Sequence, residues 1–207
     1  SASGVIFASG MQGTNGVYKS ETGDLGSFTN LCTAGIGLPS TGIQRIETAV
    51  APSDANTVYS LFYMDTTAAG GGKAVFYRST DNGASFVRVS RPADADPGIA
   101  PYDFTRQQGW YDLILKVDPN DSKVLYTGGI DAFKSVNGGD SWTQLTHWYG
   151  GFGYQYMHAD QHGIEFEGNK SDIVYFTNDG GVAQTLNGTA SMPTIAHQNT
   201  NYITAQF

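Results

Sequence analysis

Two histidines and an aspartate occupy alternate positions in the stretch MHADQHG, residues 157–163. They are His158, Asp160 and His162. Alternate residues of a β-strand lie on one face, so a strand here would direct all three side chains the same way. Two imidazoles and a carboxylate can bind Zn²⁺ or a similar cation. The alternative is that the three polar side chains line a water-filled channel, or pack against one another, without a metal.

Three aspartates could act as an acid and a base. Asp179 lies in the segment NDGG, and Asp160 or Asp112 could supply its partner. A glycosidic bond is cleaved by two carboxyl groups about 5 to 10 Å apart, one serving as acid and the other as base or nucleophile. The alternative reading is structural, because hairpin turns select sequences such as Asp-Gly-Gly.

Two runs of aromatic residues, GWYD and HWYGGFGYQYM, could form a binding surface. Exposed aromatic rings stack on sugar rings or serve as hot spots for protein partners. For Trp110 and Tyr111 we favour the other reading, in which the rings fill gaps between packed sheets. For the second run both readings stay open, and its candidate ligand-binding residues are Trp148, Tyr149, Phe152, Tyr154 and Tyr156.

An acidic, proline-containing segment at 91–108 offers a further set of carboxylates. Asp94, Asp96 and Asp103 could hold Ca²⁺ with the help of backbone carbonyls. The spacing of an EF-hand loop is absent, and acidic loops of this kind are usually solvated. The sequence thus requires no cofactor, while Ca²⁺ and Zn²⁺ remain candidates.

Composition excludes several classes of protein. The 207 residues carry a formal net charge of −8 and no Lys/Arg cluster, which argues against nucleic acid and anionic membranes as partners. Cys32 is the single cysteine, so no intrachain disulfide can form. No apolar run approaches the ~20 residues of a membrane span. With 27 glycines and short apolar runs between turn residues, the sequence predicts an all-β protein.

A repeat of about four units organises the chain. GVYKS, VFYRS, DAFKS and GVAQT end at residues 20, 79, 135 and 185, at intervals of 59, 56 and 50 residues. Each unit reads as four short strands joined by turns, and four-stranded units at this period are typical of a β-propeller. We therefore expect one partial propeller over 1–207. The approximate blades are 1–35, 36–91, 107–147 and 157–198.

The ends of the repeat suggest a section of a ring. The first unit lacks its innermost strand, and 201–207 reads as the innermost strand of a further blade or as the strand that closes a four-bladed ring. We favour a section of a larger ring. Uncovered blade faces and edges lower solubility, so we expect the remainder of the propeller to be another part of a parent protein or another chain.

The turns after the repeated strands have a structural role in this interpretation. In STDNGASF and SVNGGDSW the carboxylate or amide can accept backbone N–H bonds across its own turn, while the aromatic residue returns to the core. The residues concerned are Ser79, Asp81, Gly83, Phe86, Ser135, Asn137, Gly139 and Trp142.

These turns carry a family resemblance. STDNGASF resembles the Asp-box motif of bacterial neuraminidase repeats, and the arrangement is similar to propellers of the sortilin and xyloglucanase type. NDGG resembles the strand end that supplies a catalytic carboxylate in xyloglucan-cleaving propellers, although that family's second catalytic motif is not recognisable. The stretches around 108–129 and 158–182 resemble secreted propeller proteins of Bacteroidetes that often use the type 9 secretion system.

The resemblance implies an extracellular or cell-surface domain that binds a glycan or a protein. Its expected partners are that ligand, the remainder of the propeller and the type 9 secretion machinery, without nucleic acid or membrane insertion. A glycoside hydrolase of the xyloglucanase type is the first alternative, and we consider an enzyme less favoured than a binding domain. A structural domain of a large adhesin or secretion substrate is the second.

Overall fold

The computed structural model describes residues 4–10, 15–33, 35–65, 73–100 and 103–200. Their regular structure is almost entirely β, with one short 3₁₀ helix, η1 (Leu31–Thr33), in this part of the chain. None of the helical structure described is long and apolar enough to cross a membrane. The predicted all-β class is therefore confirmed. Residues 201–207, for which we predicted an additional innermost strand, lie outside the described residues.

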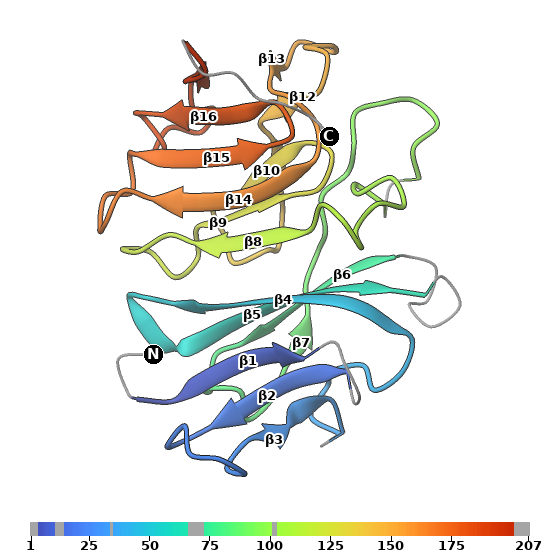
Figure 1. Ribbon diagram of the computed structural model, residues 1–207, viewed down its shortest axis with the longest axis vertical. Coiled ribbons are helices and arrows are strands. Elements are labelled where there is room, and N and C mark those ends of the chain that lie inside the picture. The colour runs from blue at the N-terminus through green and yellow to red at the C-terminus, as the bar shows by residue number, and fades with distance from the viewer. Residues whose placement is uncertain (1–3, 11–14, 34, 66–72, 101–102, 201–207) are drawn as a thin grey trace.

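Four antiparallel sheets follow one another along the chain and are stacked in that order (Figure 1). The first has three strands, β1 (Ile6–Gly10), β2 (Gly16–Ser20) and β3 (Thr29–Asn30). The second has β4 (Ile43–Ala51), β5 (Asp54–Met64), β6 (Ala74–Ser79) and β7 (Val87–Arg88). The third has β8 (Ile114–Val117), β9 (Leu125–Gly128), β10 (Ala132–Ser135) and β11 (Thr143–Gln144). The fourth has β14 (Gln161–Phe166), β15 (Val174–Asn178), β16 (Gly181–Thr185) and β17 (Ala196–His197).

Each sheet is a simple meander in which sequential strands pair with one another. A parallel pair, β12 (Thr146–His147) and β13 (Gln155–Tyr156), lies between the third and fourth sheets in the chain and brackets the second aromatic run. We call the end of the second, third and fourth sheets at which β4, β8 and β14 begin the proximal end, and the opposite end, at which the first sheet has its β2–β3 connection, the distal end (Figure 1). Because the strands alternate in direction, the β9–β10 and β15–β16 hairpins also lie at the proximal end, whereas the β10–β11 and β16–β17 connections lie at the opposite, distal end.

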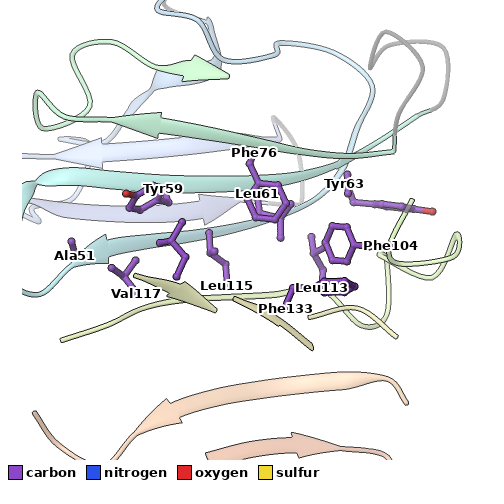
Figure 2. Packing of buried hydrophobic residues seen from close by; sticks show 12 residues of the cluster. Ala51, Tyr59, Leu61, Tyr63, Phe76, Phe104, Leu113, Leu115, Val117 and Phe133 are labelled. Carbon is purple, nitrogen blue, oxygen red and sulfur yellow. The ribbon is translucent and has the colours of Figure 1, made fainter. Parts of the chain in front are cut away.

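Apolar side chains fill the space between successive sheets. Between the second and third sheets, Tyr59, Leu61 and Phe76 face Leu115 and Phe133 (Figure 2). Equivalent clusters join the first sheet to the second and the third to the fourth. The second and third sheets carry apolar side chains on both faces, because each of them is covered by a neighbouring sheet on both sides. Face-to-face burial of this kind provides most of the stability of stacked sheets.

The repeated turns at the distal end form the same hydrogen bonds twice. Ser79 Oγ accepts the N–H of Gly83 at 2.8 Å and donates to Asp81 Oδ1 at 2.7 Å, and Asp81 Oδ1 accepts the N–H of Ser85 at 2.9 Å. The turn that begins at Ser135 makes the corresponding bonds with Asn137 in place of the aspartate. Gly83 has a φ of 79°, a conformation that favours glycine. These side chains are occupied in holding their turns.

A basic residue of each inner sheet reaches the turn of the next sheet. Arg78 Nη1 donates to the carbonyl of Gly138 at 3.0 Å, and Lys134 Nζ donates to the carbonyl of Gly188 at 2.6 Å. Both residues directly precede the hydroxyl residue that ends the third strand of their sheet. The same polar bridge therefore joins the second sheet to the third and the third to the fourth.

Candidate ligand-binding site

Asp179 is the centre of a polar group at the proximal end. The Tyr111 hydroxyl lies 3.1 Å from both carboxylate oxygens of Asp179, and His162 Nε2 lies 2.6 Å from its Oδ1. The rings of Tyr111 and His162 also meet edge to face, with centroids 4.7 Å apart. The bond that closes the local turn is made by Asn178, whose Oδ1 accepts the N–H of Gly180 at 3.0 Å. Asp179 is therefore held by other segments of the chain and does not close its own turn.

The segment that carries Tyr111 is fixed by an arginine of the second sheet. Arg45 Nη1 donates to the carbonyl of Tyr111 at 2.6 Å, and Arg45 Nη2 donates to the carbonyl of Leu113 at 2.8 Å. This segment places Asp112 in the interior, with its side chain fully buried. Among the described residues, no group donates a hydrogen bond to either carboxyl oxygen of Asp112.

Burial gives Asp112 an unusual protonation state. The pKa of Asp112 is raised to about 8, mainly by burial of the carboxyl group and secondly by the neighbouring carboxylate of Asp160. The pKa of Asp160 is also raised, first by burial and then by the charge of Asp179. A protonated Asp112 can donate to Asp160, a bond that lowers the pKa of Asp160 and explains why Asp112 finds no other partner. At neutral pH, Asp112 therefore carries a proton.

The three aspartates that the sequence offered as catalytic candidates thus meet in one place. Asp160 interacts electrostatically with both Asp112 and Asp179, although the three residues come from different segments. Their environments differ, since Asp112 is buried and protonated, while Asp179 accepts bonds from a phenol and an imidazole. A carboxyl group that keeps its proton at neutral pH, placed beside less buried carboxyl groups, can supply both an acid and a base.

The predicted metal set of His158, Asp160 and His162 is not formed. The expectation that they share one strand face was wrong, because β14 begins only at Gln161 and Asp160 has a φ of 63°, in the left-handed region. His158 Nδ1 contacts the carbonyl of Ala159, while His162 turns to Asp179. Among the described residues, these three do not bring ligand atoms within 4.8 Å of one another.

Most rings of the second aromatic run are exposed. Four of them have exposed fractions between 42% and 52%, while Tyr154 is half-buried. The exposed ones are Trp148, Tyr149, Phe152 and Tyr156. The gap-filling role expected for Trp110 and Tyr111 was wrong, because Trp110 is 65% exposed and Tyr111 40%. Both aromatic runs consequently contribute to the surface of the proximal end.

A pocket of about 270 Å³ lies between Trp148 of the second aromatic run and the carboxyl group of Asp160. Trp148 lines it together with Asp160, and Gln108 Nε2 lies 3.5 Å from Asp160 Oδ1 within it. The remaining lining residues are Arg106, Ile130 and Ala159. The pocket thus combines an aromatic ring, a guanidinium, an amide and a carboxylate, which together can contact both the apolar faces and the hydroxyl groups of a ligand.

Arg106 organises the acidic segment for which we predicted Ca²⁺ binding. Its Nε lies 2.8 Å from Asp94 Oδ2, and its Nη2 lies 2.5 Å from Asp96 Oδ2. Burial raises the pKa of Asp96, but hydrogen bonds from Tyr149 and Arg106 outweigh it and lower that pKa. Asp103 accepts a bond from Thr105 instead and is not part of this network. The predicted set of Asp94, Asp96 and Asp103 is therefore not assembled as one site.

Two buried residues near Arg106 were missed by the sequence reasoning. Asp131 and His147 are both fully buried. Burial, followed by the charge of Asp94, raises the pKa of Asp131 to about 8. Asp131 opens the DAFKS element in the β9–β10 hairpin, and Asp179 lies in the corresponding β15–β16 hairpin of the next sheet. An aspartate in the same hairpin of two successive repeats was the one signal in the sequence that could have marked Asp131.

Solved structures with the same arrangement of sheets identify the fold. A GH74 enzyme from Niastella koreensis matches with a TM-score of 0.51 and 22% identity, over 93% of this chain and 29% of that one. The GH74 xyloglucanase from Xanthomonas campestris matches with a TM-score of 0.56 and 20% identity, over 89% and 27%. YCF48 bound to D1 peptide matches with a TM-score of 0.53 and 9% identity, over 94% and 52%. The chain is a partial β-propeller.

The similarity extends over only part of each of these proteins. The propeller section described here spans less than a third of the two GH74 chains and about half of the YCF48 chain. At these levels of identity the likeness concerns the fold. No protein-family model matches the sequence, and no curated protein matches it.

Proposed function

We propose that this chain is a secreted or cell-surface propeller domain whose proximal end binds an extracellular glycan. One observation carries the proposal. Exposed aromatic rings border a pocket whose polar groups are Arg106, Gln108 and Asp160. Sugar rings present apolar faces that stack on aromatic side chains, and hydroxyl groups that bond to carboxylate, amide and guanidinium groups.

Charge narrows the class of glycan. The formal net charge is −8, and the pocket is lined by Asp160, which has the carboxylate of Asp179 as a neighbour. An anionic polysaccharide would be repelled by this field, whereas a neutral one would not. We therefore favour a neutral polysaccharide built of hexose or pentose units. The extracellular location, the type 9 secretion machinery and the remainder of the propeller as partners belong to the same proposal and rest on the sequence resemblance.

Isothermal titration of the chain with neutral oligosaccharides, including fragments of xyloglucan and of unbranched β-glucan, tests the proposal. We expect Trp148→Ala to weaken binding by about tenfold or more, because it removes the ring that lines the pocket. Phe28→Ala is the matched control, since Phe28 is also an exposed ring but belongs to the first sheet's β2–β3 connection, at the distal end. Equal affinity of the two variants, or binding of a protein but of no glycan, would contradict the proposal.

Hydrolysis of a glycan is the second candidate function. It is favoured by the neutral Asp112 beside Asp160 and by the partly exposed, hydrogen-bonded Asp179 next to them. In such a mechanism one carboxyl would protonate the leaving oxygen while the other activated water or attacked the sugar. Release of reducing ends from xyloglucan by the wild type, with loss of at least about 10²-fold in Asp179→Asn, is the expected result. Binding without any release of reducing ends in the wild type would leave a binding domain.

A further inference from the structure

A second polar cluster lies at the proximal end, between the connection from β7 to β8 and the third sheet. Asp94 comes from this connection, Asp131 from the β9–β10 hairpin and His147 from the end of β12. Each residue offers one carboxylate oxygen or imidazole nitrogen, and these three atoms lie within 4.8 Å of one another. Three ligand atoms from three separate segments can converge on a single cation.

Two atoms of this cluster form no hydrogen bond with any of the described residues. Asp131 and His147 are fully buried, and neither Asp131 Oδ1 nor His147 Nε2 has a hydrogen-bond partner. Gln144 Nε2 bonds the other oxygen, Asp131 Oδ2, at 3.4 Å, and the backbone N–H of Trp148 is close enough to the carboxyl to lower its pKa. Buried polar atoms are normally paired, so two orphaned ligand atoms side by side point to a missing partner.

The charges of the cluster do not balance. Arg106 lies 3.0 Å or less from oxygens of both Asp94 and Asp96, and its Nη2 is 3.8 Å from Asp131 Oδ2. Within the described ranges, no lysine and no other arginine forms an ion pair with these three carboxylates. One guanidinium therefore faces three carboxyl groups, and ionisation of all three, which a bound metal ion would favour, leaves two negative charges. A divalent cation supplies the charge that is lacking.

His147 has a competing arrangement without a metal. Its Nε2 lies 3.4 Å from Asp96 Oδ2, and the N–H of Tyr149 lies 3.5 Å from its Nδ1. A proton on Nε2 would favour the contact with Asp96, whereas a metal on Nε2 requires the proton on Nδ1. The Tyr149 contact is at the long limit for a hydrogen bond, so it opposes the second arrangement only weakly.

We propose that Asp94, Asp131 and His147 form a divalent-metal site. One imidazole nitrogen and two carboxylate oxygens suit Zn²⁺ or Mn²⁺ better than Ca²⁺, which takes six to eight oxygen ligands. The site adjoins the proposed glycan pocket, because Arg106 lines that pocket and pairs with Asp94, but none of the three proposed ligands lines the pocket. It would fasten the β7–β8 connection to the third sheet, beneath the rings of Tyr149 and Phe152, whose centroids lie 4.1 and 5.2 Å from that of His147.

The test uses the 207-residue chain, freed of metal with a chelator, dialysed and titrated with Zn²⁺, Mn²⁺ or Ca²⁺ by calorimetry. We expect one equivalent of Zn²⁺ or Mn²⁺ to bind, to raise Tm, and to bind at least about tenfold more tightly than Ca²⁺. Asp131→Asn and His147→Gln should each weaken binding by about tenfold or more. The matched control is His162→Asn, which changes a histidine of the other polar group and should bind as the wild type does.

Absence of saturable binding in the wild type, or equal affinity in Asp131→Asn, His147→Gln and the wild type, overturns the proposal. Because substitution of a buried group can unfold a chain, circular dichroism of each variant accompanies the titrations. An independent measurement needs no buried substitution. Pulsed electron paramagnetic resonance of bound Mn²⁺ should show coupling to an imidazole nitrogen that persists when His158 and His162 are both replaced by asparagine. Missing coupling, or its loss in that double variant, also refutes the site.

Discussion

The carboxyl groups of Asp112 and Asp160 lie within hydrogen-bonding reach of each other at the proximal end, and only Asp160 is reached by solvent. Burial and the charge of Asp160 raise the pKa of Asp112 to about 8, so Asp112 keeps its proton near neutral pH. The chain thus keeps a neutral acid directly beside the pocket lined by Asp160.

This pair predicts how stability depends on pH. Asp112 has a pKa near 3.8 when unfolded and about 8 when folded, so between these values the folded state binds the additional proton. The free energy of unfolding should therefore fall as pH rises from about 4 to 8, by at most about 1.4 kcal/mol per pH unit for this group. In Asp112→Asn the slope should be smaller. Urea unfolding at several pH values measures it, with Asp24→Asn at an exposed position as control.

The repeated turns predict a tolerated and a damaging substitution at one position. Asn137 makes with its amide oxygen the bonds that Asp81 makes with its carboxylate. Asp81→Asn should therefore change the free energy of unfolding by less than about 0.5 kcal/mol at pH 7, while Asp81→Ala should cost about 1–2 kcal/mol. A similar loss in both variants, measured by urea unfolding, would show that the charge matters more than the hydrogen bonds.

The same turn predicts a difference in acid. Hydrogen bonds, first from Ser85 and then from Ser79, lower the pKa of Asp81 to about 2. A lowered pKa stabilises the folded state above the unfolded value and is lost as pH falls from about 4 towards 2. Asp81→Asn should lose less stability than the wild type over that interval, by a small amount because the group is exposed. Parallel acid titrations followed by circular dichroism would reveal no difference if the carboxylate were unperturbed.

Replacement of Phe104 tests how strongly the connection between the second and third sheets contributes to the free energy of unfolding. This buried ring lies outside both sheets, yet its centroid is 6.0 Å from that of Phe76 and 5.5 Å from that of Phe133. Phe104→Ala should cost about 3–5 kcal/mol, because it leaves a cavity between the two sheets. Val136→Ala, at an exposed position, should cost less than about 0.5 kcal/mol. A comparable loss of urea stability in both would contradict the packing described.

Tyr111 and Asp179 should be energetically coupled. Their hydrogen bond joins the segment before β8 to the β15–β16 hairpin across two sheets. In a double-mutant cycle of Tyr111→Phe and Asp179→Asn, we expect a coupling energy of about 0.5–1 kcal/mol in urea unfolding. Strictly additive effects would mean that the bond contributes nothing to holding the two segments together.

The fold was readable from the sequence because it is repeated locally. Turn sequences such as STDNGASF determine their own hydrogen bonds, and the alternation of apolar residues determines which faces of the strands are buried. A repeat then displays the same signals several times, so that even the degenerate turn at Thr185 could be placed, where Thr185 Oγ1 donates to Asn187 at 2.8 Å.

The site was only partly readable, because its contacts join segments far apart in the chain. Asp160 was assigned to a strand only because polar residues alternate there. Its left-handed φ interrupts the strand, and the sequence gives no sign of this beyond the fact that aspartate tolerates that conformation. Arg106 reaches Asp94 within its own connection, but Asp131 and His147 approach it only when the third sheet has packed. Exposure of Trp110 likewise depends on how neighbouring sheets are stacked.

The bridges from Arg78 to Gly138 and from Lys134 to Gly188 give the row of sheets a direction. Each cation contacts a turn that comes later in the chain, so the turn of one sheet receives this bond from the sheet that precedes it. Duplication or removal of a whole module preserves every such bridge if the cut is made at the same repeat position. A propeller built in this way can gain or lose a blade and keep the polar bridges between its neighbouring blades.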